Sequence, residues 1–319
     1  MNRLRFAAFV LALAASVISC PGAFAWGCDG HQTVALIAKQ NLNPHALAMV
    51  TQILHDNPID PALYRYCKPV ETDPMTDAAT WADDYRAKHQ ETAEWHFIDI
   101  PRGAAKGSFT CDPTTSCITL ALAAQIKILQ TPGSSPADQA NALRFIIHFA
   151  GDIHQPLHCT TNNDRGANCV PVTFFGKKPR ETSKTAESYE DNLHGNWDTQ
   201  LVERIEDGKS VDDFATFLNT KYQSHFAAWK ASGINFDDWA WDSHEDAETK
   251  SYGKLNKKIP VETSAAVSTC ADANHISTRM LALNEKVGPT YQTRVAPTIE
   301  VQIAKAGFRL SMILNQIWP

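Results

Sequence analysis

The feature that most constrains this chain is an apolar helical period, Asn141 to Ala150, that carries ionisable residues. A helix with such a pattern is buried on most of its sides. His148 and Asp152 lie four residues apart, so both side chains project from the same face. An unpaired aspartate is costly to ionise in an apolar core. Either a metal ion or a buried hydrogen bond to His148 removes that cost, and the pair alone does not decide between them.

Further histidines and aspartates repeat this pattern along the chain. Pro156 should end the helix and let His158 turn toward a neighbouring position. His194 and Asp198 have the same four-residue spacing, and imidazole with carboxylate is a common zinc ligand set. Taken alone, the second pair is more typical of a surface helix. The presence of several such clusters in one chain favours a metal centre.

Another candidate pair lies earlier in the chain, where Asp83 is followed thirteen residues later by His96. Asp84 and His89 lie nearby and are easily mistaken for ligands. We predict that both are solvated, since Asp84 points about 100° away from Asp83 on a helix. His154 lies about 240° round the helix from His148, and we predict a structural role for it.

The N-terminal segment differs in composition from the rest of the chain. An early basic pair is followed by an apolar run from Phe6 to Val17 and by Ala23-Phe24-Ala25 before Trp26. This pattern predicts a secretory signal peptide over residues 1–25, with cleavage before Trp26. A lipoprotein site at Cys20 is a competing interpretation, but the Ala-x-Ala site is the better formed. No later stretch reaches the roughly 18 apolar residues of a membrane span. We expect a secreted or periplasmic protein without a membrane anchor.

Cleavage would make the segment from Trp26 to His31 the new N-terminus. A free α-amino group and its own carbonyl can chelate a metal ion, so cleavage would be a condition of activity. It also lowers the formal charge from −6 to −8, because the leader carries Arg3 and Arg5 and no acid. The acidic charge argues against a basic groove for duplex DNA. Bound metal ions would still attract phosphate locally.

Seven of the eight cysteines remain after cleavage, and in an oxidising compartment they indicate disulfides with one cysteine left over. Cys111 with Cys117 and Cys159 with Cys169 are candidates for local bridges. The connectivity does not follow from the spacing. A cysteine zinc site is disfavoured, because no Cys-x-x-Cys occurs and the histidines and aspartates supply enough ligands.

Most long segments have a helical period, whereas strand signals are few. Helices are predicted over Thr33–Gln40, Ala46–Leu54, Ile118–Leu129, Asn141–Ala150, Val211–Trp229 and Pro297–Ile317. The best strand is Val170–Phe175, and the polar stretch Thr160–Asp191 is typical of a long functional loop. No linker, repeat or low-complexity tract divides residues 26–319. We therefore predict an all-α, mainly helical single domain with long loops and disulfides.

The motifs, taken together, resemble those of a known family. They are Trp at the new N-terminus with His five residues later, Trp-Ala-Asp with a following Arg, His-Phe-Ile-Asp, His-x-x-x-Asp-x-His-Gln-Pro-Leu-His, and Asn-Leu-His-x-x-Trp-Asp. As an ordered set from Trp26 to Asp198, they are similar to the trinuclear-zinc single-strand nucleases. That family includes mung bean nuclease, the fungal type I (S-one and P-one) nucleases and the plant bifunctional nucleases. Bacterial zinc-dependent phospholipase C is a relative.

The resemblance implies three zinc ions per chain in a mainly helical single domain of this kind. Each ion would be held by histidine and aspartate side chains, with one aspartate shared and one site completed by the amino nitrogen and carbonyl oxygen of the first mature residue. The first zinc would be held by Asp83, His96, His148 and Asp152, the second by Trp26, His31 and the shared Asp152, and the third by His158, His194 and Asp198.

The chemistry expected of this layout is hydrolysis of single-stranded DNA and RNA. Two zinc ions that share Asp152 would lower the pKa of a bridging water, and the third would stabilise the leaving 3′ oxygen. The products would be 5′-phosphorylated, and 3′-nucleotidase activity is expected as well. Arg86 would clamp a phosphate oxygen, and Asp99 would orient the nucleophile or accept a proton. Phe97 would stack on a base. Core packing for Phe97 and a surface salt bridge for Arg86 are the alternatives.

Two other functions fit parts of the pattern. A zinc-dependent phospholipase C would use the same metals, but Asp198 stands where those lipases use a glutamate. A non-catalytic zinc protein would have closed sites, whereas the third ligand set leaves an open position. The segment Arg165-Gly166-Ala167-Asn168 and the charged insertion Lys177–Asp191 depart from the family, which leaves the substrate preference open. Cys28 could tether the N-terminal segment to the body, with Cys67 as one possible partner. We expect a monomer without a stable protein partner.

Overall fold

The long apolar periods of the sequence form helices in the computed structural model, which describes residues 26–67, 73–114, 116–262 and 269–319. The helices are α1 (Gly27–Gln40), α2 (Pro44–Asp56), α3 (Pro74–Arg86), α4 (Ile118–Gln130), α5 (Pro136–Asp152), α6 (Leu193–Gly195), α7 (Leu201–Glu206), α8 (Val211–Tyr222), α9 (Phe226–Ala231), α10 (Phe236–Asp246), α11 (Asp272–Leu283) and α12 (Pro289–Ile317). The predicted signal peptide lies outside the described residues. In the described part of the chain, no helix is long and apolar enough to cross a membrane.

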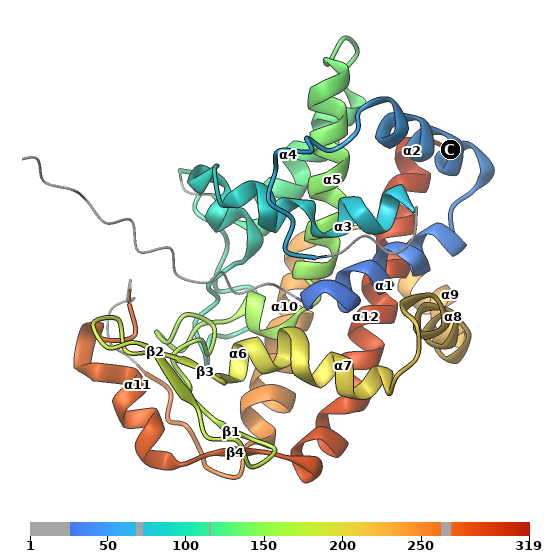
Figure 1. The fold of residues 1–319 in the computed structure, drawn as a ribbon. Helices are drawn as coiled ribbons and strands as arrows, with labels where there is room; N and C mark the ends of the chain where they lie inside the picture. The colour runs from blue at the N-terminus through green and yellow to red at the C-terminus, as the bar shows by residue number, and fades with distance from the viewer. Residues whose placement is uncertain (1–25, 68–72, 115, 263–268) are drawn as a thin grey trace, which may run out of the picture.

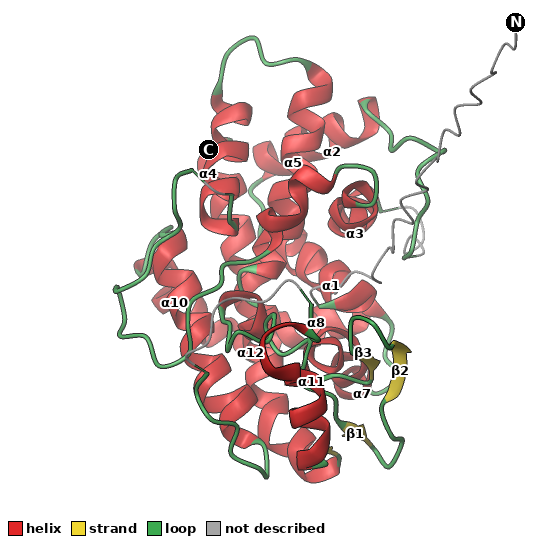
Figure 2. Ribbon diagram, turned by 90° about the vertical axis from the view of Figure 1, so that its left-hand side faces the viewer, coloured by secondary structure: helices red, strands yellow, loops and turns green. Residues whose placement is uncertain are grey.

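The strands are short and lie to one side of the helices, as Figures 1 and 2 show. Strand β1 (Thr173–Phe174) pairs in parallel with β4 (Lys286–Val287), and β2 (Arg180–Ser183) pairs antiparallel with β3 (Ser188–Glu190). The prediction of a mainly helical single domain is confirmed. The predicted strand is shorter than expected, and the charged insertion forms a hairpin rather than an open loop.

Local sequence signals determine where several helices begin. Helices α2, α3 and α5 each start with proline at the first position, directly after the capping residues Asn43, Asp73 and Ser135. Each capping side chain accepts a hydrogen bond from a backbone N–H of the first turn, which has no partner within the helix. The periodicity alone placed the start of α5 at Asn141, but the Ser-Pro signal places it at Pro136.

The core is built where α1, α3, α5 and α12 pack on one another. In Figure 1, α12 crosses the molecule beside α1 and α5. The crossing with α1 is close: a Cβ atom on Gly307 would lie 2.5 Å from the Cβ of Ile37. Helix α12 begins before the predicted start at Pro297, which lies within it. The predicted helix Val211–Trp229 is divided at Gln223–His225 into α8 and α9.

Three disulfides join segments of the described chain. Cys28 pairs with Cys67 and Cys111 with Cys117, as expected. The expected bridge between Cys159 and Cys169 is wrong. Cys169 instead pairs with Cys270, which is 101 residues away along the chain.

Cys159 is a free and fully buried thiol. Its sulfur lies 3.3 Å from the carbonyl oxygen of Ile153, inside the turn that follows α5. Cys169 is buried as well, but it is bonded to Cys270. The spacing of ten residues made the pair look local, whereas the fold brings Cys270, and not Cys159, to Cys169.

The lengths of the closed loops predict how much each bridge stabilises the fold. In the chain-entropy model, a loop of about 100 residues is worth about 5 kcal/mol and one of about six residues about 2 kcal/mol. Replacing Cys169 and Cys270 by serine should therefore lower the free energy of unfolding by more than twice the loss in the Cys111→Ser/Cys117→Ser control. Urea denaturation of both double variants measures the difference. Equal losses would contradict the entropic account.

Candidate metal centre

Four buried side chains from three elements meet around Asp152. Asp83 comes from α3, His96 from the end of the 3-10 turn Gln90–His96, and His148 and Asp152 from the C-terminal half of α5. The Oδ2 atom of Asp152 lies 3.0 Å from Nδ1 of His96 and 3.2 Å from Nε2 of His148. Asp83 lies 3.7 Å from each of these two nitrogens.

His31 of α1 approaches the same carboxylate from the other side. Its Nε2 lies 3.2 Å from Oδ1 of Asp152, and its ring stacks on that of His148 with the centroids 4.1 Å apart. One oxygen of Asp152 therefore faces His31, and the other faces His96 and His148. The Asp152 carboxylate can therefore contribute one oxygen to each of two groups of metal-binding side chains.

A second group lies beyond His96. His158 follows α5 in the turn Pro156–Cys159, His194 lies in α6, and Asp198 lies in the next turn, Asn196–Gln200. The Nε2 atoms of the two histidines are 3.1 Å apart, and Asp198 lies 3.2 Å from His194. Burial raises the pKa of Asp198 well above its ordinary value, so a positive charge is needed to keep this carboxylate ionised.

The hydrogen bonds of His158 and His194 fix which ring nitrogen faces the cluster. Nδ1 of His158 donates to the carbonyl of His96 over 2.8 Å, and Nδ1 of His194 donates to the carbonyl of Gly166 over 2.6 Å. In the neutral rings, the two Nε2 atoms are then both acceptors and face each other. Burial lowers the pKa of His194 to about 3, so a proton cannot separate them near neutral pH. A metal ion can.

Buried polar atoms without a hydrogen-bond partner gather at these side chains. Within the described residues, they include both ring nitrogens of His31, one carboxylate oxygen each of Asp83, Asp152 and Asp198, and Nε2 of His96. Unpaired buried polar atoms are rare because each costs about 1–3 kcal/mol. Cations placed between them would remove that cost, so the residues present fit a metal centre.

The electrostatics agree with this interpretation. Burial lowers the pKa of His96 to about 4, which leaves a neutral ring that can bind a metal. Burial acts the same way on His148, but Asp152 and Asp83 outweigh it and raise its pKa to about 9. A positive charge is therefore favoured between this ring and the two carboxylates. Metal ions supply such a charge.

The structure brings together all eight predicted ligand side chains. Ligand atoms within 4.8 Å of one another occur in three groups: His31, Asp83 and His148; His96, His148 and Asp152; and His158, His194 and Asp198.

Trp26, the ninth predicted ligand, is held beside His31. Its buried indole donates to the carbonyl of Gly151 over 2.9 Å, and its own carbonyl accepts from the N–H of Gly30. A Cβ atom on Gly151 would lie 2.7 Å from Nδ1 of His31 and 3.6 Å from the indole ring. Gly151 therefore allows both residues to approach Asp152. In the full chain the nitrogen of Trp26 is part of a peptide bond.

The three predicted substrate-contacting residues lie around this centre. Arg86 forms an ion pair with Asp83 over 3.1 Å. The side chain of Asp99 is exposed to solvent. Desolvation by the surrounding groups, and then the charges of Asp164 and Glu94, raise its pKa to about 6. Phe97 is half-buried and stands outside the hydrophobic cluster of the described residues.

A tight loop supports the second group of ligands. Asn163, Arg165, Gly166 and Ala167 all have positive φ angles. A Cβ on Gly166 would lie 2.4 Å from the carbonyl oxygen of Leu157, so only glycine fits where its carbonyl accepts from His194. Sequence reasoning noted this loop but not its role. Gly166, which stands between Arg165 and Ala167, is the sequence signal that could have indicated this supporting role.

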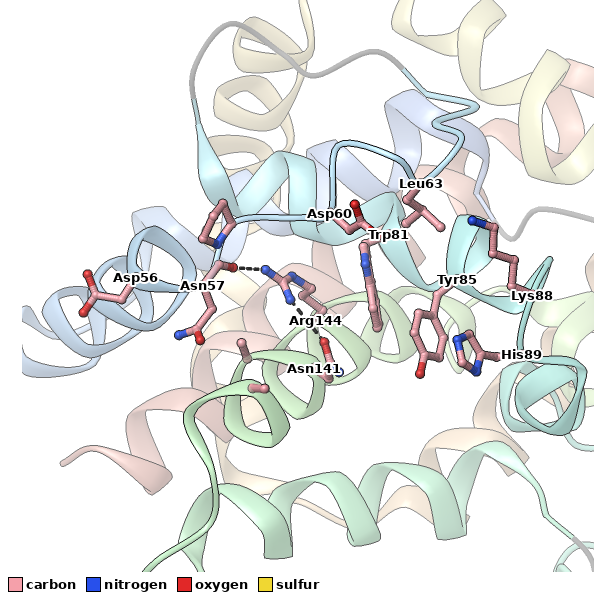
Figure 3. A pocket seen from close by; sticks show the side chains of 13 residues that line it. Asp56, Asn57, Asp60, Leu63, Trp81, Tyr85, Lys88, His89, Asn141 and Arg144 are labelled. Atoms are coloured by element: carbon pink, nitrogen blue, oxygen red, sulfur yellow. Dashed lines mark hydrogen bonds between the residues drawn. The ribbon is translucent and has the colours of Figure 1, made fainter.

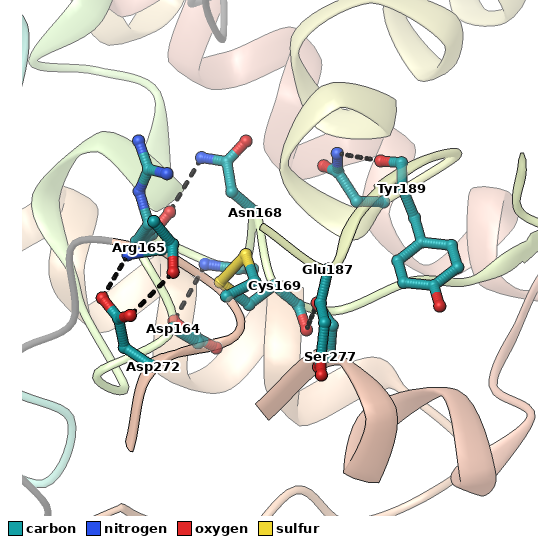
Figure 4. The surroundings of a disulfide bond; sticks show 12 residues. Asp164, Arg165, Asn168, Cys169, Glu187, Tyr189, Asp272 and Ser277 are labelled. Atoms are coloured by element: carbon teal, nitrogen blue, oxygen red, sulfur yellow. Dashed lines mark hydrogen bonds between the residues drawn. A yellow bond between two sulfur atoms is a disulfide. The ribbon is translucent and has the colours of Figure 1, made fainter. Parts of the chain in front are cut away.

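Buried Asp164 and a disulfide hold the loop in place. Asp164 accepts hydrogen bonds from the hydroxyl of Tyr252 over 2.9 Å and from the N–H of Ala167 over the same distance. Figure 4 shows the loop beside Cys169, which is bridged to Cys270. Arg165 projects outward and is exposed. No local pattern indicated a role for Asp164, because its partner Tyr252 comes from a segment nearly ninety residues away.

The prediction that Asp84 is solvated is wrong. Asp84 is buried, pairs with Arg65 over 2.7 Å and accepts a hydrogen bond from the N–H of Tyr66. The helical angle correctly turned it away from Asp83, but the segment before α3 folds over that side. The structural role of His154 agrees with its contacts. Its ring bonds to the carbonyl of Ala150 over 2.8 Å and to Arg309 over 3.0 Å.

A helical domain that buries clustered histidines and aspartates with unpaired ligand atoms is typical of metal-binding proteins, among them metal-dependent hydrolases. The S1/P1 Nuclease family model matches residues 26–319. This chain therefore belongs to the S1/P1 nuclease family, and it is a hydrolase of phosphodiester bonds.

Individual relatives support the assignment over nearly the whole chain. The chain is 29% identical to Nuclease P1 of Penicillium citrinum over 309 residues, which cover 92% of this chain and 97% of that protein. It is 29% identical to Nuclease S1 of Aspergillus oryzae over 308 residues, 92% of each. It is 23% identical to Endonuclease 2 of Arabidopsis thaliana over 310 residues, 94% of this chain and 93% of that protein.

The contact at Gly151 yields a test of the geometry. Gly151→Ala should lower nuclease activity by about 10- to 100-fold, because the added methyl must displace His31 and small misplacements in a catalytic site are costly. Gly195→Ala is the matched control. Gly195 lies between His194 and Asp198, but its added Cβ would approach no atom closer than 3.5 Å. Initial rates on single-stranded DNA measure both. Equal activity of the two variants would contradict the assigned position of His31.

Proposed function

We propose that this protein is a zinc-dependent endonuclease that hydrolyses single-stranded DNA and RNA to 5′-phosphorylated products and also removes phosphate from 3′-nucleotides. The observation that carries the proposal is the buried Asp152 carboxylate, whose two oxygens face ligand groups from different elements. Membership of the S1/P1 nuclease family supports single-strand specificity. Relatives named Nuclease P1 and Nuclease S1 support the same reading.

The chain would hold three zinc ions. Histidine nitrogen with carboxylate oxygen is a ligand set that suits zinc, and the described clusters contain no cysteine ligand. The proposed ligands are Asp83, His96, His148 and Asp152 for the first ion, Trp26, His31 and Asp152 for the second, and His158, His194 and Asp198 for the third.

The chemistry that bound zinc supplies is activation of water and stabilisation of phosphate charge. The protein's own groups would position the substrate. Arg86, which contacts Asp83 over 3.1 Å, would orient a phosphate oxygen with its guanidinium group. Asp99, with a pKa of about 6, ionises near neutral pH and would accept a proton or orient the attacking group.

Recognition of single strands would rest on stacking rather than on a basic groove. Phe97 follows ligand His96 directly and stands outside the hydrophobic cluster, so its ring is available to an unpaired base. The chain carries a net charge of −6, which is unlike the basic surfaces that bind duplexes through their phosphates. A base in a duplex would be stacked and out of reach of the Phe97 ring.

The protein would act outside the cytoplasm as a monomer. Three disulfides in the described chain are typical of an oxidising compartment. The N-terminal composition predicts cleavage before Trp26. The position of Trp26 beside His31 supports a role for its liberated amine as a ligand.

Metal analysis tests the catalytic proposal. The purified protein should contain three zinc ions per chain, lose turnover of single-stranded DNA on chelation and regain it with zinc. Asp152→Asn should lose bound zinc and more activity than the about 10- to 100-fold that removal of a ligand-orienting group costs. Asp84→Asn is the control, since Asp84 is also buried but pairs with Arg65. Chelation without effect on single-stranded DNA, RNA and 3′-nucleotides would exclude a metal mechanism.

The N-terminal ligand can be tested separately. A protein that begins at Trp26 should be active, whereas one extended by a single alanine before Trp26 should lose zinc and activity, because the added peptide bond removes the free amine. The zinc content of each form reports the loss directly, and a C-terminal extension of equal length is the control. Full activity of the N-terminally extended form would remove Trp26 from the ligand set.

A further inference from the structure

Arg165 is an exposed cation at the edge of the metal centre, in the loop that supports the second group of ligands. It directly precedes Gly166, whose carbonyl accepts a hydrogen bond from Nδ1 of His194 over 2.6 Å. A Cβ atom on Gly166 would lie 3.2 Å from the same nitrogen. The backbone of Arg165 is therefore one residue away from a contact with a proposed metal ligand.

The segment that carries Asp99 runs beside the start of this loop. The N–H of Ile98 donates to the carbonyl of His158 over 2.8 Å. The N–H of Thr161 donates to the carbonyl of Ile100 over 2.9 Å. Ile98 and Ile100 are buried, whereas Asp99 between them is exposed. Because successive side chains of an extended segment point to opposite sides, the Asp99 carboxylate faces the solvent, as Arg165 does.

The charge of Arg165 reaches both neighbouring groups. Desolvation raises the pKa of Asp99 to about 6, and the positive charge of Arg165 opposes that rise. Burial lowers the pKa of His194 to about 3, and the charges of His158, Arg165 and Arg86 act in the same direction. Arg165 and Arg86 thus place positive charge near the same ligand from two different segments of the chain.

The other arginines near the centre already have partners. Arg86 forms an ion pair with an aspartate of α3. Figure 3 shows Arg144 of α5, which donates to two asparagines and lies over the Trp81 ring, 5.4 Å from its centroid. In Figure 4 the guanidinium of Arg165 points away from its loop, and within the described residues it forms no ion pair. Its donors are available to an anionic group of the substrate.

The backbone of Arg165 is held in place, although its side chain is exposed. Its φ angle is +58°, which is uncommon for a residue with a Cβ atom. Its carbonyl accepts from the side-chain amide of Asn168 over 2.8 Å, and buried Asp164 accepts from the N–H of Ala167 over 2.9 Å. These bonds fix the loop on both sides of Arg165. Only the side chain has to become ordered when it binds a ligand, which favours binding.

We propose that Arg165 is a specificity-determining residue that binds the 5′-phosphate of the nucleotide whose 3′ oxygen is released. The direction of the strand rests on the proposed function, in which that oxygen lies at His158, His194 and Asp198. The nucleotide that carries it would then lie against the Arg165 loop, and its 5′-phosphate is its next anionic group. A guanidinium donates two parallel hydrogen bonds to phosphate oxygens, which suits this contact.

Rates on two dinucleotides test the proposal. Thymidylyl-thymidine contains only the phosphate that is cleaved, and its 5′-phosphorylated form adds the phosphate assigned to Arg165. Wild type should have a kcat/KM about tenfold higher on the phosphorylated form, as expected for one charge-assisted hydrogen bond. Arg165→Gln should remove this preference and leave the rate on the unphosphorylated form unchanged. Arg165→Lys should restore part of the preference, because it restores the charge without the fork of donors.

Two controls separate this contact from a general effect of charge. The 3′-phosphorylated dinucleotide has the same net charge as the 5′-phosphorylated one, but its internal bond should be cleaved equally well by wild type and Arg165→Gln. Lys230→Gln removes one positive charge from an exposed position on α9 and should retain the preference. Zinc content should be equal in all variants, since no proposed ligand is changed.

The possible failures are distinct. Wild type that cleaves both dinucleotides at the same rate would overturn the role of Arg165 and leave the proposed function intact. An equal loss of activity on both dinucleotides in Arg165→Gln, or a loss of zinc, would show that Arg165 only supports the loop. Wild type that cleaves no single-stranded substrate at all would overturn the proposed function, and the assignment of the 5′-phosphate with it.

Discussion

The structure depends on keeping the carboxylate of Asp152 ionised in a fully buried position. Burial of a charge without compensation costs several kcal/mol. Here three imidazole rings lie within 3.2 Å of its two oxygens, and they come from α1, from the turn before α4 and from α5 itself. These contacts hold only if the helices that carry them pack together correctly. The helix packing that forms the fold is therefore the same packing that stabilises the buried carboxylate of Asp152.

Close helix packing makes that arrangement possible. Gly307 lets α12 press against Ile37 of α1, and Gly151 lets α5 approach His31 on the same helix. Helix α1 is thus positioned by two close contacts, one with Gly307 of α12 and one with Gly151 of α5. His148 is oriented in turn by donation to the carbonyl of Ala79 on α3, over 2.7 Å. Backbone contacts of this kind fix the direction of the His148, His158 and His194 rings before any metal binds.

The sequence predicted what depends on local spacing. The four-residue separation of His148 from Asp152, and of His194 from Asp198, places each pair on one face of a helix whatever the rest of the chain does. Pattern reasoning also gave the mainly helical fold. It placed Asp84 in solvent, because the helix angle says where a side chain points but not what covers it.

Features that depend on distant segments could not be predicted from spacing. The loop that supports His194 is held by a hydrogen bond from Tyr252 and by the bridge from Cys169 to Cys270, and neither partner is near it in sequence. The proposed ligand set as a whole was predicted from the resemblance of the ordered motifs to a known family. The role of Gly166 was not, because its need for a positive φ becomes visible only when Leu157 and His194 lie against it.

The arginines that contact α3 and α5 show how charge is distributed around the centre. Arg65 neutralises Asp77 and Asp84, and Arg86 contacts Asp83 at the edge of the ligand cluster. Each aspartate within α3 therefore forms an ion pair with an arginine. Arg144 of α5 instead places its charge over the Trp81 ring of α3, 5.4 Å from the ring centroid, and donates to Asn57 and Asn141. This cation is therefore held by an aromatic face and by uncharged acceptors, whereas the arginines beside α3 are held by carboxylates.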